Sequence, residues 1–227
     1  MAVCYALVAS PVFARQSTAA IIFFSNLLNQ NSFLFYMTSH SGRIRITGGQ
    51  WRSRIITFPA HADLRPTPDR VRETLFNWLG QDLTGLNCLD LFAGSGALGF
   101  EAASRGAANV VMIESSSVVH RVLLENKVRL KADSIELIKM DASVFLITHT
   151  RKFDVVFLDP PYRMDILPKI LSMLPPLLAE DAQIYLETQH SCDLEKNLQH
   201  WHTRRKGKAG KVNYYLLELN RDQNNHG

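Results

Sequence analysis

The feature that most restricts the fold of this chain is a regular alternation of apolar runs and amphipathic segments after Gly85. Five apolar runs predict strands at 86–92, 109–113, 135–138, 153–158 and 183–187. The segments between them have the spacing of helices, at 97–105, 116–130, 141–147 and 166–178. Strands that alternate with helices in this way build a parallel sheet covered by helices on both faces. The sequence therefore predicts an α/β fold.

The two ends of this repeat have a different pattern. Residues 201–205 and 212–219 predict two strands joined by a short basic loop, which we expect to pair antiparallel at one edge of the sheet. Near the other end, residues 43–58 alternate between apolar and basic side chains and predict a small β-hairpin extension with Gly48-Gly49 at its turn.

A further helix is expected before the first strand of the repeat. Thr67 is a suitable N-cap, and Pro68 at the first helical position needs no amide hydrogen. Val71, Leu75, Trp78 and Leu79 then fall on one helical face, and the helix is predicted to end at Gly80.

We expect four parts along the chain. Residues 1–40 form a leader that is either disordered or the product of an upstream start site, because Met37 directly precedes a segment with the pattern of a domain start. Residues 41–62 form the basic hairpin extension, and residues 63–220 form the main α/β domain. Residues 221–227 are expected to be a disordered tail.

The composition suits one globular domain and excludes several classes of protein. Hydrophobic residues make up 46% of the 227, and a net charge of +4 suits a nucleic-acid partner. The three cysteines and eight histidines lack the spacing of metal ligands or of a secreted disulfide scaffold, so we expect no metal and a cytoplasmic protein. The apolar runs are too short and too interrupted to span a bilayer, so we expect no membrane partner.

A glycine-rich loop follows the first strand of the repeat, with the sequence Leu89-Asp90-Leu91-Phe92-Ala93-Gly94-Ser95-Gly96-Ala97-Leu98-Gly99. Glycines at such a junction of strand and helix allow a tight turn and the close approach of a ligand to the backbone. Glu114, at the end of the next strand, is placed to accept hydrogen bonds from a ribose. These features indicate a nucleoside cofactor, and they fit both a nicotinamide dinucleotide and S-adenosylmethionine.

Two further carboxylates bear on that choice. Asp90 immediately precedes the glycines, where it would repel the pyrophosphate of a dinucleotide but not a cationic sulfonium ligand. Asp141 begins the helix after the third strand, where it can accept a hydrogen bond from an adenine amino group. The structural alternative is that Asp90 and Asp141 cap turns or helices, and that Glu114 takes the place of a helix N-cap.

The string Val155-Val156-Phe157-Leu158-Asp159-Pro160-Pro161-Tyr162 puts a proline-stiffened loop at the carboxyl end of a buried strand. Ligands of open α/β sheets bind at that edge, beside the glycine loop. The Asp159 carboxylate and the Pro160 carbonyl can accept both N–H bonds of a base amino group, and Tyr162 can stack on the flipped base. We therefore expect this loop to hold a base for methyl transfer; the alternative is a stiff turn with a capping Asp.

The glycine loop and Asp159-Pro160-Pro161-Tyr162 resemble those of S-adenosylmethionine-dependent amino-methyltransferases, which have a seven-stranded Rossmann-like fold. A narrower resemblance, from about Gly42 to Leu219, is to the RsmD family of bacterial 16S ribosomal RNA guanine-N2 methyltransferases. It rests on Arg43-Ile44, Ile46, Gly48-Gly49, Trp51-Arg52, Arg65-Pro66-Thr67, residues 69–78, residues 89–99, Glu101-Ala102, residues 104–107 and Lys208-Ala209-Gly210.

The resemblance implies S-adenosylmethionine as the cofactor, and 16S ribosomal RNA of the small subunit as the partner, with guanine 966 in ribosomal numbering as the target. It implies cofactor contacts at Asp90, Phe92, Ala93, Gly94, Ser95, Gly96, Glu114, Asp141 and Ala142, and we expect Arg65 and Thr67 to line the same pocket. Residues 159–162 would hold the target base, and Tyr162 keeps a stacking ring where the family commonly has Phe. We expect a monomer.

Two basic segments without acidic residues, 41–58 and 204–211, are expected to contact RNA phosphates on either side of the active edge. The predicted contacts are Arg43, Arg45, Arg52, Arg54, Arg204, Arg205, Lys206 and Lys208. The alternative for each segment is a solvated charged surface.

Three other functions compete with this interpretation. A DNA or RNA amino-methyltransferase acting on adenine N6 or cytosine N4 shares the core, although a DNA enzyme usually needs an additional recognition domain. A nicotinamide-dependent oxidoreductase would leave residues 159–162 without a role. A non-catalytic RNA-binding module would explain the arginines but not the cofactor loop.

Overall fold

The computed structural model describes residues 41–60, 64, 66–161, 166–189 and 200–220. The chain divides into two compact units, Met1–Ser41 and Gly42–Gly227, and the elements below lie in the second, except that the first strand begins at Ser41. The predicted leader and tail, together with Arg65 and Tyr162, lie outside the described residues. No helix within the described ranges is long and apolar enough to cross a membrane.

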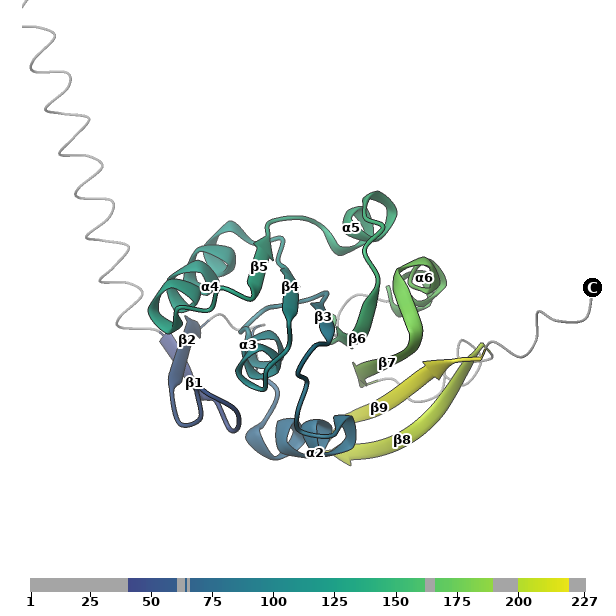
Figure 1. Cartoon of the computed structure of the whole chain (residues 1–227), viewed down its shortest axis with the longest axis horizontal. Coiled ribbons are helices and arrows are strands. Elements are labelled where there is room, and N and C mark those ends of the chain that lie inside the picture. Colours follow the sequence, from purple (N-terminus) through teal and green to yellow (C-terminus); the bar gives the residue numbers. More distant parts are fainter. Residues whose placement is uncertain (1–40, 61–63, 65, 162–165, 190–199, 221–227) are drawn as a thin grey trace, which may run out of the picture. The chain divides into compact units, whose positions relative to one another are not determined.

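A seven-stranded sheet forms the centre of the second unit (Figure 1). Its strands are β3 (Asn87–Asp90), β4 (Asn109–Ile113), β5 (Ile135–Ile138), β6 (Phe153–Leu158), β7 (Leu178–Thr188), β8 (Trp201–Ala209) and β9 (Val212–Leu219). Their order in the sheet is β5-β4-β3-β6-β7-β9-β8. Neighbours from β5 to β7 are parallel, whereas β9 is antiparallel to both β7 and β8. The predicted α/β fold and its antiparallel edge pair are confirmed.

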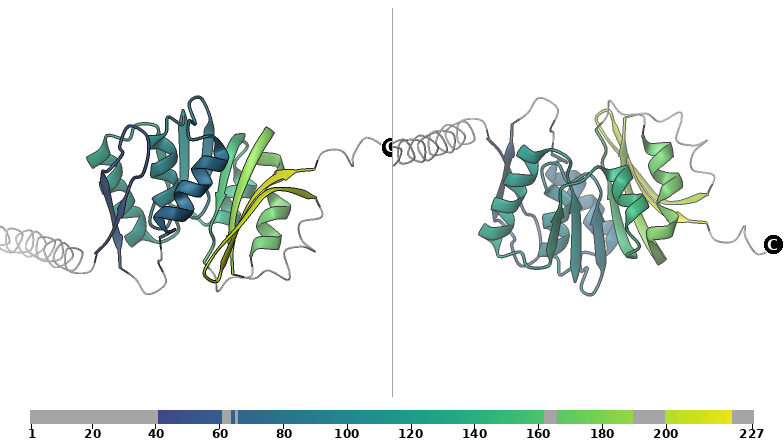
Figure 2. Two further views of the ribbon diagram at one scale, coloured as in Figure 1. Left: turned by 90° about the horizontal axis from the view of Figure 1, so that it is seen from below. Right: turned by 90° about the horizontal axis from the view of Figure 1, so that it is seen from above.

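Helices cover both faces of this sheet (Figure 2). They are α2 (Asp69–Leu79), α3 (Ala97–Ser104), α4 (Ser117–Leu130), α5 (Ala142–Thr148) and α6 (Leu167–Met173), the last followed by a short 3₁₀ helix, η1 (Pro175–Leu177). The first three share a buried apolar cluster with Cys88 and Phe157, and α5 and α6 share another with Leu89 and Val156. Because successive strand residues point to opposite faces, this division places α2, α3 and α4 on one face and α5 and α6 on the other.

Two strands are longer than the sequence predicted. β7 begins at Leu178, directly after η1, rather than at Gln183. β8 continues to Ala209, so the predicted basic loop is wrong, and most of its residues lie on a strand. The basic side chains hid the apolar alternation expected of a strand. They are tolerated because β8 is the edge of the sheet, where charged side chains point into water and discourage further strand pairing.

The hairpin extension consists of β1 (Ser41–Arg45) and β2 (Ile55–Pro59), which form a separate two-stranded sheet. The hairpin is confirmed, but its predicted tight turn at Gly48-Gly49 is wrong, because residues 46–54 form a longer connection. This connection folds onto the end of α3: Gly49 has φ +71°, and a Cβ there would lie 1.8 Å from the Ser104 carbonyl oxygen. Glycine is required at that position by the close packing.

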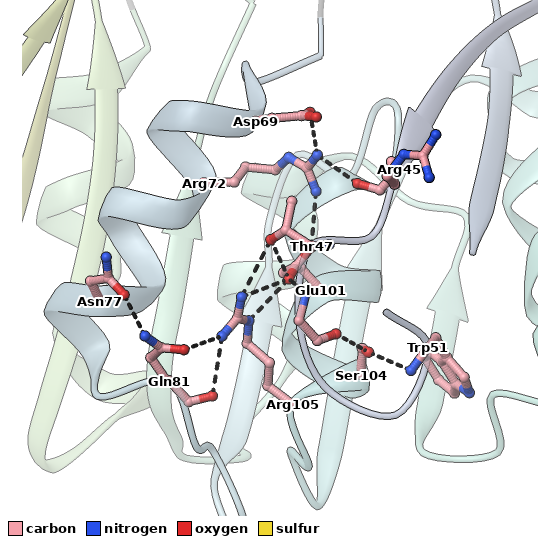
Figure 3. Close-up of polar contacts among 11 residues, drawn as sticks. Arg45, Thr47, Trp51, Asp69, Arg72, Asn77, Gln81, Glu101, Ser104 and Arg105 are labelled. Atoms are coloured by element: carbon pink, nitrogen blue, oxygen red, sulfur yellow. Dashed lines mark hydrogen bonds and ion pairs between the residues drawn. The ribbon is translucent and has the colours of Figure 1, made fainter. Parts of the chain in front are cut away.

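A buried carboxylate fastens this connection to the main domain (Figure 3). Glu101 on α3 accepts hydrogen bonds from the Thr47 backbone N–H at 2.9 Å and the Gly48 N–H at 2.7 Å. The same carboxylate forms ion pairs with Arg72 of α2 and with Arg105, each at 2.9 Å. A buried charge is tolerated only when it is paired and hydrogen-bonded in this way, so the network joins the hairpin to two helices.

The start of α2 also differs from the prediction. Its N-cap is Pro68, without a side-chain capping bond, so the expected capping role of Thr67 is wrong. The Thr67 hydroxyl instead donates to the Asp159 carboxylate, and a hydrogen bond to a charged acceptor is stronger than one within a neutral cap. The predicted end of the helix is correct: Gly80 has φ +99° and its N–H donates to the Phe76 carbonyl.

Candidate active site

A pocket of about 350 Å³ opens at the carboxyl ends of the parallel strands, a size typical of small-molecule sites. Most of the predicted site residues line it: Thr67, Asp90, Phe92, Ala93, Gly94, Ser95, Glu114, Asp141, Ala142, Asp159, Pro160 and Pro161. The glycine loop and the residue 159–161 loop therefore face one cavity. The pocket has further lining residues that the sequence did not predict, because single apolar and serine residues form no distinctive motif: Leu64, Leu98, Ser115, Ser116, Val119, Met140, Ser143 and Ile166.

The glycine loop has the backbone conformation that its sequence requires. Gly94 and Gly96 have φ values of +47° and +80°, in the left-handed region that favours glycine. Gly96 does not line the pocket; a Cβ there would lie 2.7 Å from the Leu123 side chain, so this glycine permits the packing of α3 on α4. Gly94 presents its backbone to the pocket itself.

Asp90 lies at the junction of β3 and the glycine loop and is 2% exposed. Its Oδ2 accepts a hydrogen bond from the Gly99 N–H at 3.0 Å, which ties the strand end to α3. Burial raises the pKa of Asp90 to about 7 against the opposing effect of the Gly99 bond, and the negative charge of Glu114 adds to the rise. The carboxylate therefore braces the loop and also lines the pocket, where a cation would favour its ionised form.

Glu114 and Asp141 combine a structural contact with a place in the pocket wall. Glu114 accepts from the Gly94 N–H at 3.0 Å and from the Ser116 N–H at 2.6 Å. It is not the N-cap of α4, because the Ser116 side chain caps that helix. Asp141 is the N-cap of α5 and accepts from the Ser143 N–H at 2.8 Å. Asp141 therefore caps a helix, as the structural alternative expects, and it also lines the pocket, as the cofactor prediction requires.

Asp159 follows β6 directly and forms another part of the pocket wall. Burial raises the pKa of Asp159 well above its ordinary value, and the charges of Glu187 and Asp90 raise it further. The hydrogen bond from Thr67 acts in the opposite direction and favours the carboxylate. This carboxyl group is consequently a better proton acceptor than an ordinary aspartate.

Glu187 was missed in the sequence, although it follows the apolar run of β7 in the same way that Asp159 follows β6. It is 3% exposed, and the register of β6 and β7 places it beside Asp159. The Tyr185 hydroxyl donates to Glu187 Oε1 at 2.6 Å. Burial, together with the charge of Glu187, raises the pKa of Tyr185 above its ordinary value, so this hydroxyl keeps its proton. The signal that could have revealed Glu187 is an acid at the end of a predicted parallel strand.

The charge of the pocket discriminates between cofactors. Its described lining contains carboxylates but no lysine or arginine: Asp90, Glu114, Asp141 and Asp159. Such a wall suits a ligand with a positive sulfonium and ammonium and opposes the pyrophosphate of a dinucleotide. The residues present therefore fit S-adenosylmethionine. Within the described ranges, no group of three or more His, Cys, Asp or Glu side chains is arranged to hold a metal ion.

Comparison with known proteins identifies the family. A family model described as Conserved hypothetical protein 95 matches residues 44–218. Over 182 residues the chain is 43% identical to ribosomal RNA small subunit methyltransferase D of Escherichia coli K12, covering 79% of this chain and 92% of that protein. The chain belongs to the ribosomal RNA small subunit methyltransferase D family. The resemblance predicted from the two loops and the flanking motifs is confirmed.

Other members of the methyltransferase D family agree with this assignment. The Haemophilus influenzae protein of the same name is 39% identical over 183 residues, covering 78% of this chain and 94% of its own. The solved structure of the Escherichia coli methyltransferase yhhF, with 41% identity, superposes with a TM-score of 0.69 over 78% of this chain and 98% of that one.

The predicted RNA-binding residues are all exposed. They belong to two separate parts of the fold, the β1–β2 hairpin and β8 (Figure 1). The hairpin carries Arg43, Arg45, Arg52 and Arg54, and its connection contacts the end of α3 that is remote from the glycine loop. β8, at the opposite edge of the sheet from β5, carries Arg204, Arg205, Lys206 and Lys208. Of these, Arg204 pairs with Glu218 at 3.2 Å, and Lys206 lies over the Tyr215 ring.

Proposed function

We propose that this chain transfers a methyl group from S-adenosylmethionine to the exocyclic N2 of a guanine in 16S ribosomal RNA, guanine 966 in ribosomal numbering. The observation that carries the proposal is that the Asp159-Pro160 loop and the glycine loop line one pocket. The names of the relatives support ribosomal RNA of the small subunit as the substrate. The pocket lining argues against the nicotinamide alternative, as described above.

The donor side would hold the cofactor through carboxylates and backbone. S-adenosylmethionine supplies a methyl group bound to a positively charged sulfur, which is a good electrophile. Asp90 would stabilise that positive region, and Gly94 allows the ligand to approach the backbone. Glu114 would accept from the ribose hydroxyls, and Asp141 from the adenine amino group. These roles are compatible with the backbone contacts because a carboxylate can accept several hydrogen bonds.

The acceptor side would prepare the amino group of the base. The Asp159 carboxylate and the Pro160 carbonyl would each accept an N–H, which localises the nitrogen lone pair and orients it toward the donor side. The proline ring removes a competing amide donor and fixes the backbone at this point. After transfer, the methylated nitrogen is acidic and releases its proton to Asp159 or to water. The raised pKa of Asp159 favours that final step.

Exposed basic side chains would bind the phosphates of the substrate. The hairpin and β8 can contact RNA on two sides of the domain, and such contacts position the substrate without reading its sequence. We further propose that the enzyme acts as a cytoplasmic monomer on ribosomal RNA or on small-subunit particles.

Incubation with radiolabelled S-adenosylmethionine and small ribosomal subunits from a strain that lacks the enzyme tests the proposal. Nucleoside analysis of the product should show N2-methylguanosine at a single position. A label found on adenine or cytosine, or absence of transfer to any ribosomal substrate, would contradict it. Calorimetry adds a cofactor test, because binding of NADH without binding of S-adenosylmethionine would contradict the donor side of the proposal.

A further inference from the structure

Two acidic residues follow paired positions of the neighbouring strands β6 and β7, and the proposed mechanism uses only Asp159, the one that lines the pocket. In the parallel pair β6 and β7, Phe157 is level with Tyr185. Both of these side chains lie in the apolar cluster on the α2 face of the sheet. Two residues further along each chain are Asp159 and Glu187, and the period of two along a strand directs both toward that same face.

The Glu187 carboxylate is held in a defined position. Tyr185 donates its hydroxyl hydrogen to Glu187 Oε1, and the Tyr185 ring packs against the Tyr214 ring, with centroids 6.4 Å apart. Leu158 and Leu186, which precede Asp159 and Glu187, pair in the register of β6 and β7, so the two acidic residues lie beside one another. A carboxylate offers about four acceptor positions, so Glu187 can accept from a ligand in addition to its protein partners.

Two neighbouring acceptors suit a base with two neighbouring N–H donors. On its Watson–Crick edge, guanine presents the ring N1–H beside the amino group at C2. Adenine and cytosine instead present a ring nitrogen with a lone pair beside their amino groups. A lone pair held against a buried carboxylate is costly, because both groups have lost water without gaining a hydrogen bond. Guanine places a donor against each carboxylate and so relieves their mutual repulsion.

We propose that Glu187 is a specificity-determining residue, which accepts the N1–H of the target guanine while Asp159 and Pro160 accept from its amino group. This inference rests on the proposed function, because it concerns how the same acceptor site selects its base. The pair of carboxylates then rejects adenine and cytosine, although their amino groups could also approach Asp159. Because Glu187 is shielded from solvent, water does not substitute for the missing donor.

The variant Glu187→Gln tests this role because it keeps the shape of the side chain and changes one acceptor into a donor. The Tyr185 hydroxyl needs an acceptor, so it should hold the amide oxygen where Oε1 now lies. The amide NH₂ then takes the place of Oε2. Small subunits are reconstituted from 16S ribosomal RNA that carries either guanine or 2-aminopurine at the target position. The analogue keeps the C2 amino group, but its N1 carries a lone pair instead of a hydrogen.

The unsubstituted enzyme should methylate guanine at least about tenfold faster than 2-aminopurine. Glu187→Gln should slow methylation of guanine and reduce the preference for guanine over 2-aminopurine by about tenfold or more. Tyr185→Phe is the matched control, because it keeps the carboxylate and should leave the preference within about twofold while lowering both rates.

Three results would count against these ideas, and they are distinguishable. Parallel loss of both activities in Glu187→Gln, with the preference unchanged, would overturn the specificity role. Equal rates on both bases by the unsubstituted enzyme would overturn it without any variant, so the test does not depend on the variant folding. If the unsubstituted enzyme methylates neither base while it binds S-adenosylmethionine, the proposed function itself fails.

Discussion

The carboxylates that we assign to the donor side and to the acceptor side are held in different ways. On the donor side, Asp90, Glu114 and Asp141 each accept a backbone N–H of the loop or helix start beside them. On the acceptor side, Asp159 and Glu187 accept from side-chain hydroxyls. A carboxylate that accepts backbone N–H bonds fixes the conformation of its own loop. Its removal should therefore change the cofactor affinity and the stability of the fold together. A carboxylate that accepts from a side-chain hydroxyl can be replaced while the loop keeps its conformation. Its removal should therefore change mainly the rate of methyl transfer.

The largest effect is expected for Asp159→Ala. Methyl transfer should fall by about a thousandfold or more, because the acceptor of the amino hydrogens and of the released proton is lost. The affinity for S-adenosylmethionine should stay within about threefold, since this side chain does not shape the glycine loop. Single-turnover transfer measures the first quantity and calorimetry the second. Asp181→Ala, at an exposed position on β7, is the matched control and should retain both. Equal loss of transfer and binding would break the comparison and make Asp159 a structural residue.

Asp90→Asn should affect the donor side. The amide oxygen can still accept from the Gly99 N–H, so the loop should fold, but the negative charge is lost. In the unsubstituted protein, the pKa of Asp90 is about 7, and a cationic ligand prefers its ionised form. The affinity for S-adenosylmethionine should therefore rise with pH up to about 7, by at most about tenfold per pH unit, and level off above it. Calorimetry from about pH 5.5 to about pH 8.5, in steps chosen around that pKa, should show this slope.

The Asn variant should show a weaker affinity that varies little over the same pH range. The pH dependence of the free energy of unfolding gives an independent check on the direction of the Asp90 pKa shift. Because folding raises the pKa of Asp90, the folded state binds this proton more tightly, and the contribution of Asp90 to stability falls as pH rises from about 4 to about 7. Loss of that trend in Asp90→Asn would support the assignment; an identical pH dependence of affinity in both proteins would contradict it.

Thr67→Val should have a smaller effect, on the acceptor side alone. Loss of one hydrogen bond should slow transfer by about fivefold, and the missing donor should raise the pKa of Asp159 further. The acid limb of the pH–rate profile should therefore move to higher pH. Thr67→Ser keeps the hydroxyl and should behave like the unsubstituted enzyme. A Val variant with an unshifted profile would show that Thr67 does not control this carboxyl group.

The smallest effects are expected outside the pocket. Charge reversal at Lys206 and Lys208, or at Arg52 and Arg54, should raise the KM for RNA by a few-fold and leave kcat unchanged, because phosphate contacts position the substrate. The dependence of binding on salt should also flatten, by about 0.9 in the logarithmic slope for each phosphate that is no longer neutralised. Lys131→Glu, at the end of α4, is the control. Filter binding at several salt concentrations measures both the affinity and its slope, and unchanged binding would remove that segment from the RNA interface.

Local patterns in the sequence were enough to predict much of the fold. The predicted limits of β4, β5 and β6 match those of the structure, because each is a short apolar run bounded by polar or turn residues. β8 was underestimated because its edge position removes the need for apolar side chains on both faces. The connection at residues 46–54 was misjudged because its glycines serve a contact with a distant helix rather than a turn.

The sequence by itself determined the succession of strands and helices along the chain and the two loops that line the pocket, because apolar periodicity, glycine conformation and proline stiffness act over a few residues. Only the tertiary structure decided which polar groups meet. The Thr67 hydroxyl donates to Asp159 instead of capping its own helix. Glu187 lies beside Asp159 because β7 is the parallel neighbour of β6. Such partners are far apart in the chain. A buried polar group forms hydrogen bonds with them only when the packed sheet and helices have excluded water.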